Sequence, residues 1–171
     1  AFISHSIASL NDNGKAAVVV PHGLLFRGGA DAKIRQELIR ADLIEAVIGL
    51  PPNLFSNAGI PVVVLLFNKN KATERKGKVL FIDASKEYKA QRGQNFLEEE
   101  QFNKIVEAYT SMSEQKQYSY LASIEEIADA DWLLTIPRYV SVSEVESEFG
   151  TVHVDLPRFE NAGNALKRLD E

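Results

Sequence analysis

Two short loops hold the residue types in this sequence that could take part in recognition or chemistry. They are Pro21-His22-Gly23 and Pro51-Pro52-Asn53-Leu54-Phe55. A histidine can exchange a proton near neutral pH, and the ring of Phe55 could meet a flat ligand. No carboxylate or nucleophile stands at a catalytic spacing from His22, so a loop histidine bonded to nearby backbone is the favoured interpretation. Residue types alone therefore suggest a binding surface and leave its ligand open.

Three apolar runs are expected to position these loops: residues 16–20, 43–50 and 61–67. Each run is short, rich in Val or Ile and bounded by Pro, Gly or Asn, which predicts strands buried on both faces. A helical pattern joins the first two runs, so they are expected to form a parallel pair with a right-handed crossover. Ligands of open α/β sheets bind beyond the carboxyl ends of such strands. Two ordinary strand exits are the simpler alternative.

The helix between these strands is expected to start at Asp31, a good N-cap residue. Its buried face would carry Ile34, Leu38 and Ile39, and Arg35 would lie on its solvent face. The connection from residue 49 to residue 60 is too short for a helical crossover, so the third strand is expected to return antiparallel. On sequence alone, packing of Phe55 back onto the sheet is favoured over contact with a ligand.

The remaining sequence predicts further elements in the order strand, loop, helix, extended segment, helix and extended segment. Ser123 is expected to cap the last of these helices. We divide the chain after residue 112, into a region that holds the three apolar runs, residues 1–112, and a C-terminal extension, residues 113–171, that is mostly helical or irregular. The predicted elements, in order, are residues 79–82, 88–95, 97–111, 116–124, 124–130 and 136–140, with a final helix over 159–171.

Composition excludes several classes of site. The 171 residues include no cysteine, which rules out disulfides, thiolate catalysis and cysteine-based zinc sites. No paired metal spacing and no complete phosphate-binding loop is present, so we expect no metal. No apolar run is long enough to span a membrane, and we expect a cytoplasmic protein without a membrane partner.

Charge is distributed unevenly along the chain. Residues 1–68 have five Lys/Arg and five Asp/Glu, residues 69–92 have eight against three, and residues 93–171 have six against sixteen. A basic middle could bind nucleic acid and an acidic tail could bind a protein. A solvated loop and a solvated helical surface are the favoured alternative.

Several separated blocks stand in a fixed order along the chain: AAVVVPHGLLFRGG, LIEAVIGLPPNLFSNAGIPVVVLLFNKNK, VLFIDAS, FNKIVEAY and DWLLTIPRYV. In this order they resemble the modification subunit of type I restriction-modification systems. The resemblance covers roughly residues 1–140. It implies an adenine-N6 DNA methyltransferase that uses S-adenosylmethionine, with residues 1–112 as a partial methyltransferase domain.

The resemblance also implies a fold. The family has a Rossmann-like sheet of seven strands whose last strand is antiparallel. Our three apolar runs would be its final three strands, in the C-terminal half of an α/β methyltransferase sheet, followed by a helical C-terminal segment. The family's glycine-rich cofactor loop and Asn-Pro-Pro-Phe/Tyr motif do not occur in this sequence. We therefore expect a fragment of a longer parent protein that is inactive alone, with no catalytic residue of its own and unknown cofactor contacts.

The family relationship suggests a role for both loops. Adenine methyltransferases flip the target base out of the duplex and hold it by stacking and hydrogen bonds. By resemblance, Pro21-His22-Gly23, Asn53 and Phe55 would form a wall of the target-base pocket. The implied partners are DNA and the specificity and restriction subunits of the same system.

Two other interpretations stay open. The chain could be a non-catalytic assembly module whose acidic tail and final helix bind a specificity subunit, which truncation near residue 140 would test. It could also be another kind of Rossmann-like nucleotide-binding protein, although the lack of a complete glycine-rich loop argues against that.

Overall fold

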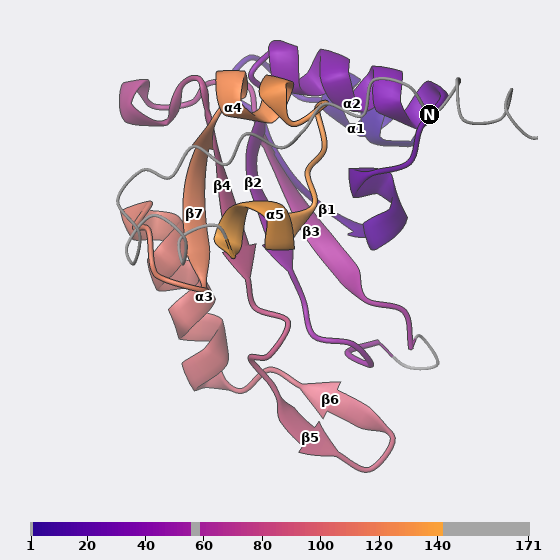
Figure 1. Cartoon of the computed structure of the whole chain (residues 1–171), viewed down its shortest axis with the longest axis vertical. Helices are drawn as coiled ribbons and strands as arrows, with labels where there is room; N and C mark the ends of the chain where they lie inside the picture. Colours follow the sequence, from indigo (N-terminus) through magenta and orange to yellow (C-terminus); the bar gives the residue numbers. More distant parts are fainter. Residues whose placement is uncertain (1, 56–58, 142–171) are drawn as a thin grey trace, which may run out of the picture.

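A mixed sheet of five strands lies at the centre of the computed structural model, which describes residues 2–55 and 59–141 (Figure 1). The strand order is β1-β3-β2-β4-β7. The strands are β1 (Lys15–Pro21), β2 (Ile44–Gly49), β3 (Val62–Asn68), β4 (Lys78–Asp83) and β7 (Ser119–Ser123).

Strand β3 runs antiparallel to both of its neighbours, β1 and β2, which confirms the predicted antiparallel return. Strand β4 is parallel to β2, and β7 is antiparallel to β4. Strands β1 and β2 therefore point the same way, as predicted. The prediction that they pair with each other is wrong, because β3 lies between them. The short connection allows β3 to fold back into the space between them.

Only part of the expected burial is found. Every residue of β2 is buried, because β3 and β4 flank it and side chains pack on both faces. Strand β1 pairs with β3 alone among the described residues, and its residues are mostly exposed or half-buried. The prediction that residues 16–20 are buried on both faces is therefore wrong. An apolar run by itself does not tell a central strand from an edge strand.

Helices cover the two faces of the sheet with separate cores. Helices α2, α4 and α5 contribute to one core, with Val79 and Phe81 of β4. Helix α3 contributes to the other core, with Leu80 and Ile82 of the same strand. This alternation along β4 follows from the two-residue period of a strand. The helices are α1 (Phe2–Ala8), α2 (Ala30–Arg40), α3 (Glu99–Ser111), α4 (Ile124–Asp129) and α5 (Ile136–Val140), with the short 3-10 turns η1 (His22–Leu25) and η2 (Thr73–Arg75).

Some local predictions hold and others need correction. Ser123 caps α4 as predicted, since its hydroxyl accepts a hydrogen bond from the Glu126 backbone N–H at 3.1 Å. The N-cap of α2 is Gly29 rather than Asp31. Its φ of 67° is a conformation that glycine adopts without strain.

The segment expected to be extended over residues 136–140 is the helix α5. Pro137 fits the first helical turn, and Ile136, Tyr139 and Val140 are buried at helical spacing. Residues 88–95, expected to be loop-like, contain most of a hairpin of β5 (Lys89–Gln91) and β6 (Gln94–Phe96). Gly93, with φ 89°, allows its tight turn and was the available signal.

The proposed division at residue 112 stays a prediction. Strand β7 follows that boundary and pairs with β4 of the same sheet. The helix expected over residues 159–171 lies outside the described residues.

Candidate functional site

Strands β1, β2 and β4 end at one edge of the sheet, which we call the carboxyl edge. This follows because β1 and β2 are both antiparallel to β3, and β4 is parallel to β2. The edge carries Pro21 at the end of β1, His22-Gly23 in the 3-10 turn η1 that follows, residues 51–55 after β2, and Asp83 at the end of β4 (Figure 1). Two loops that are far apart in the sequence are thus brought to the same side of the molecule.

His22 lies partly buried at the carboxyl edge. Its Nε2 atom is buried and has no hydrogen-bond partner in the part of the chain that the structure describes. Burial lowers the pKa of His22 below its usual 6.5, and the opposing effect of the Asp83 charge is smaller. The imidazole is therefore mainly neutral at pH 7, and Nε2 is an enclosed polar atom without a partner among the described residues.

Arg35 of α2 fixes the turn that follows His22. Its guanidinium donates hydrogen bonds to the carbonyls of Leu24 and Arg27, both at 3.0 Å, and to that of Trp132 at 2.8 Å. The side chain is buried, so its predicted place on the solvent face of α2 is wrong. The long cationic side chain of Arg35 thus supplies donors to three part-buried carbonyls.

The loop of residues 51–55 separates an anchoring side chain from an exposed one. Leu54 packs against the core on the α3 side of the sheet. The ring of Phe55 is 45% exposed, so the favoured expectation that it packs back onto the sheet is wrong. Asn53 has φ 54°, a left-handed conformation that asparagine adopts more readily than most residues. The loop thus turns sharply and leaves the phenyl ring available for contact.

The β5–β6 hairpin supports this loop, which sequence reasoning did not foresee. The Asn95 backbone N–H donates to the Asn53 carbonyl at 2.9 Å, and its side-chain amide donates to the Pro52 carbonyl at 2.8 Å. The Gln94 side-chain amide donates to the Leu54 carbonyl at 2.9 Å. Residues about 40 positions later therefore hold the backbone of the 51–55 loop.

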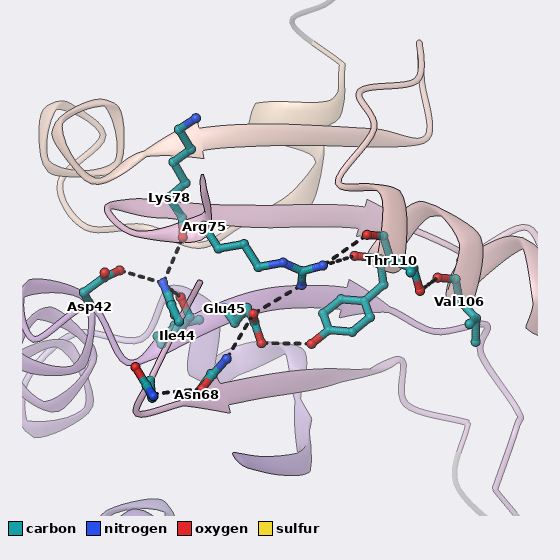
Figure 2. A network of polar contacts seen from close by, with 11 residues as sticks. Asp42, Ile44, Glu45, Asn68, Arg75, Lys78, Val106 and Thr110 are labelled. Atoms are coloured by element: carbon teal, nitrogen blue, oxygen red, sulfur yellow. Dashed lines mark hydrogen bonds and ion pairs between the residues drawn. The ribbon is translucent and has the colours of Figure 1, made fainter. Parts of the chain in front are cut away.

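A buried polar network lies at the opposite edge of the sheet (Figure 2). The Glu45 carboxylate accepts hydrogen bonds from the Tyr109 hydroxyl at 2.8 Å, and from the Asn68 amide and the Arg75 guanidinium at 3.2 Å each. Burial raises the pKa of Glu45, but these donors and the Arg75 charge together outweigh burial and lower it below 4.5. Glu45 is therefore a charged structural residue that joins β2, β3 and α3.

Part of the basic segment, residues 69–78, also lies at this edge. Lys71 is buried, and its Nζ atom donates to Asp42 Oδ1 at 2.6 Å and to the carbonyls of Ile44 at 2.7 Å and Lys78 at 2.9 Å (Figure 2). Arg75 also donates to the carbonyl of Thr110 at 3.1 Å. These two cations bind their own chain, away from the carboxyl edge.

The described residues do not fit a metal or a cofactor. Within them, no group of three or more His, Asp or Glu side chains is placed to hold a metal ion. Gly28-Gly29 precedes α2 without the glycine-rich pattern of a nucleotide loop. A hollow of about 360 Å³ beside β1 is lined mainly by apolar side chains of α1, β1 and α2. This part of the chain therefore does not form an S-adenosylmethionine site by itself.

The helices were also compared with the length and apolar character of a membrane span. In residues 2–55 and 59–141, no helix has the length and apolar character needed to cross a bilayer.

Comparison with known proteins places the chain among DNA methylases. The family model described as N-6 DNA Methylase matches residues 1–148. The methylase subunit of the type I restriction enzyme MjaVII from Methanocaldococcus jannaschii is 41% identical over 161 residues, covering 92% of this chain and 28% of that protein. The MpnII methylase subunit from Mycoplasma pneumoniae is 34% identical, with 86% and 27% covered. The chain thus spans little more than a quarter of these relatives' length.

A solved structure shows the same fold. The methyltransferase subunit of a type I restriction-modification system from Streptococcus thermophilus is 43% identical, with a TM-score of 0.77 over 81% of this chain and 29% of that one. The sequence match and the fold agree. The chain belongs to the N-6 DNA methylase family, as a homologue of type I restriction-modification methylase subunits.

Proposed function

We propose that this chain is part of a site-specific adenine-N6 DNA methyltransferase, the modification subunit of a type I restriction-modification system. The whole enzyme would transfer a methyl group from S-adenosylmethionine to DNA adenine, in a complex with specificity and restriction subunits. Within it, the carboxyl edge of this sheet would form one wall of the target-base pocket. The exposed ring of Phe55, on a loop held in place by β6, is the observation that carries this proposal.

The strand order supports a position for the chain in the family's sheet. In our proposal, β1, β2 and β3 are the last three strands of a seven-stranded Rossmann-like sheet. The family's last strand is antiparallel, and β3 runs antiparallel to β1 and β2, between which it lies.

The residues of the wall have separable roles. Phe55 would stack on the flipped adenine, because the flat face of a base packs against an aromatic ring. Neutral His22, which is partly buried at the carboxyl edge, would line the pocket as an uncharged ring. Pro21, Gly23 and Asn53 would shape the backbone on either side. None of these groups performs methyl transfer, so the chain alone is expected to be inactive.

Replacing Phe55 by alanine in the full-length subunit, assembled with its specificity subunit, tests the wall. A mismatch at the target position lowers the cost of flipping, so the wild-type complex should bind that duplex more tightly than the matched one. Loss of one base–aromatic stack costs about 1–3 kcal/mol, so Phe55→Ala should weaken binding of the mismatched duplex roughly 5- to 150-fold. Fluorescence anisotropy with the two duplexes measures this.

Phe102→Ala provides the control, because it removes another exposed ring, on α3. It should leave the preference for the mismatched duplex unchanged. If Phe55→Ala also leaves both binding and methylation unchanged, Phe55 does not belong to the site.

The assembly interpretation stays a prediction. Its acidic tail and final helix fall in residues 142–171, outside the described part of the chain. The interpretation as another nucleotide-binding protein is set aside, because the family match covers residues 1–148.

A further inference from the structure

The β5–β6 hairpin projects from the body of the molecule on the side of the carboxyl edge (Figure 1). All three residues of β5 are exposed, so the hairpin does not serve to bury a core. Its turn is Arg92-Gly93, and the φ of 89° at Gly93 keeps it tight. A projecting two-stranded element with little buried surface is marginal without support.

That support comes from the loop that carries Phe55. Three hydrogen bonds join Gln94 and Asn95 to the carbonyls of Pro52, Asn53 and Leu54. The hairpin and the 51–55 loop are therefore one structural unit. Whatever lies against Phe55 therefore lies close to β6, next to the turn of the hairpin.

The charges of this unit leave two cations available. Lys89 pairs with Glu98 at 2.7 Å, and Lys104 pairs with Glu87, so these carboxylates are neutralised nearby. Arg92, at the tip, is exposed and makes no hydrogen bond or ion pair with the rest of the described chain. Lys86, which precedes the hairpin, is exposed in the same way.

Aromatic rings accompany these cations. Tyr88 is 39% exposed and Phe96 is 41% exposed, and both flank the hairpin strands. Cations that reach phosphates, interleaved with exposed rings, are the combination that nucleic-acid-binding surfaces use. A phosphate backbone supplies the anion that the unpaired cation at the tip of the turn lacks.

We propose that the β5–β6 hairpin is a second DNA contact, in which Arg92 and Lys86 bind backbone phosphates of the duplex beside the target adenine. This inference rests on the proposed function, since it places the target base against the loop that the hairpin supports. The contact is to phosphate and sugar, so it positions the duplex and carries no sequence information. At the opposite edge, Lys71 and Arg75 bind their own chain.

The test uses the full-length subunit assembled with its specificity subunit and compares Arg92→Gln with Lys76→Gln. Lys76 is exposed in the basic segment at the opposite edge, so the control removes the same charge elsewhere. Duplex affinity is measured over a series of KCl concentrations. Loss of one phosphate contact should make the slope of log K against log salt less negative by about 0.9 for Arg92→Gln and should leave it unchanged for Lys76→Gln.

The two proposals fail in different ways. Arg92→Gln should weaken matched and mismatched duplexes by the same factor, whereas Phe55→Ala should reduce the preference for the mismatch without changing the salt slope. An unchanged slope and affinity for Arg92→Gln would overturn the hairpin contact and leave the pocket wall standing. Loss of the specificity subunit on copurification, with normal DNA affinity of the remaining complex, would instead make the hairpin a protein contact and also overturn it. An equal loss of duplex affinity for Lys76→Gln would show that the effect comes from net charge, and it would also overturn the hairpin contact.

Discussion

The imidazole of His22 is held in its neutral form by its surroundings. Burial lowers its pKa below 6.5, and the charge of Asp83 only partly offsets this. The unfolded chain exposes the same side chain to water, where the pKa returns to its ordinary value. The folded and unfolded chains therefore bind different numbers of protons just below neutrality, which links the pKa of His22 to stability.

This link predicts a pH-dependent stability. Because the folded pKa is the lower one, the contribution is fully present above 6.5 and is lost as pH falls from there through the folded pKa. His22→Gln should therefore flatten the decline in the free energy of unfolding between about pH 7 and pH 5. Urea unfolding of the chain at closely spaced pH values measures it.

His5→Gln, which replaces an exposed histidine of α1, is the matched control for this experiment. Parallel profiles for the wild-type and His22→Gln chains over the whole range would contradict the link.

At the scale of elements, the short helix α5 packs directly on the end of β2. A Cβ atom built on Gly49 would lie 2.8 Å from Cδ1 of Ile136, a side chain that is 2% exposed. The Gly49 carbonyl also accepts a hydrogen bond from Ala84, which joins the end of β2 to the residue after β4. The absence of a side chain at Gly49 therefore sets how closely α5 approaches the carboxyl edge.

Gly49→Ala should lower the free energy of unfolding by about 1–3 kcal/mol, because the added methyl group overpacks a closed site. Ile136→Val alone should cost about 0.5–1.5 kcal/mol, since it removes Cδ1 and leaves a small void. The double variant should lose less than the sum of the two, because the void accepts the new methyl group. Gly28→Ala, at a position with no atom within 4 Å, is the control. Strict additivity in urea unfolding would show that the two sites do not touch.

For the whole molecule, β1 is one of the two edge strands of the described sheet, and β7 is the other. Among the described residues, β1 pairs only with β3, and Val19 on it is 51% exposed. Phe2, which is 74% exposed, lines the apolar hollow beside β1. An unpaired apolar strand edge can pair with a second chain, so the isolated chain is expected to self-associate.

Val19→Lys should reduce this association, because a lysine on an edge strand opposes edge-to-edge pairing. Light scattering over a range of chain concentrations should show a mean mass that rises for the wild type and rises less for Val19→Lys. Val106→Lys adds the same charge at an exposed site on α3 and should behave like the wild type. A wild-type chain that stays monomeric at high concentration would count against the prediction.

The sequence by itself determined the elements whose patterns are local, and it indicated the family. The apolar run of β2, the helical periodicity of α2 and α3 and the Ser123 cap each depend on residues a few positions apart. The short connection after β2 was enough to predict the direction of β3. These elements follow from local patterns, whereas the type I modification subunit was suggested by the order of several separated blocks and is confirmed by the comparisons.

The tertiary structure alone decided which of these elements meet. The insertion of β3 between β1 and β2, the burial of Arg35 and the support of the 51–55 loop by Asn95 all join residues far apart in the chain. The exposure of Phe55 also depends on such contacts. Its residue type does not decide it, because a large apolar side chain can pack in a core or bind a ligand. Local patterns fix the period of a segment, whereas pairing and burial depend on the free energy of long-range contacts that no single segment encodes.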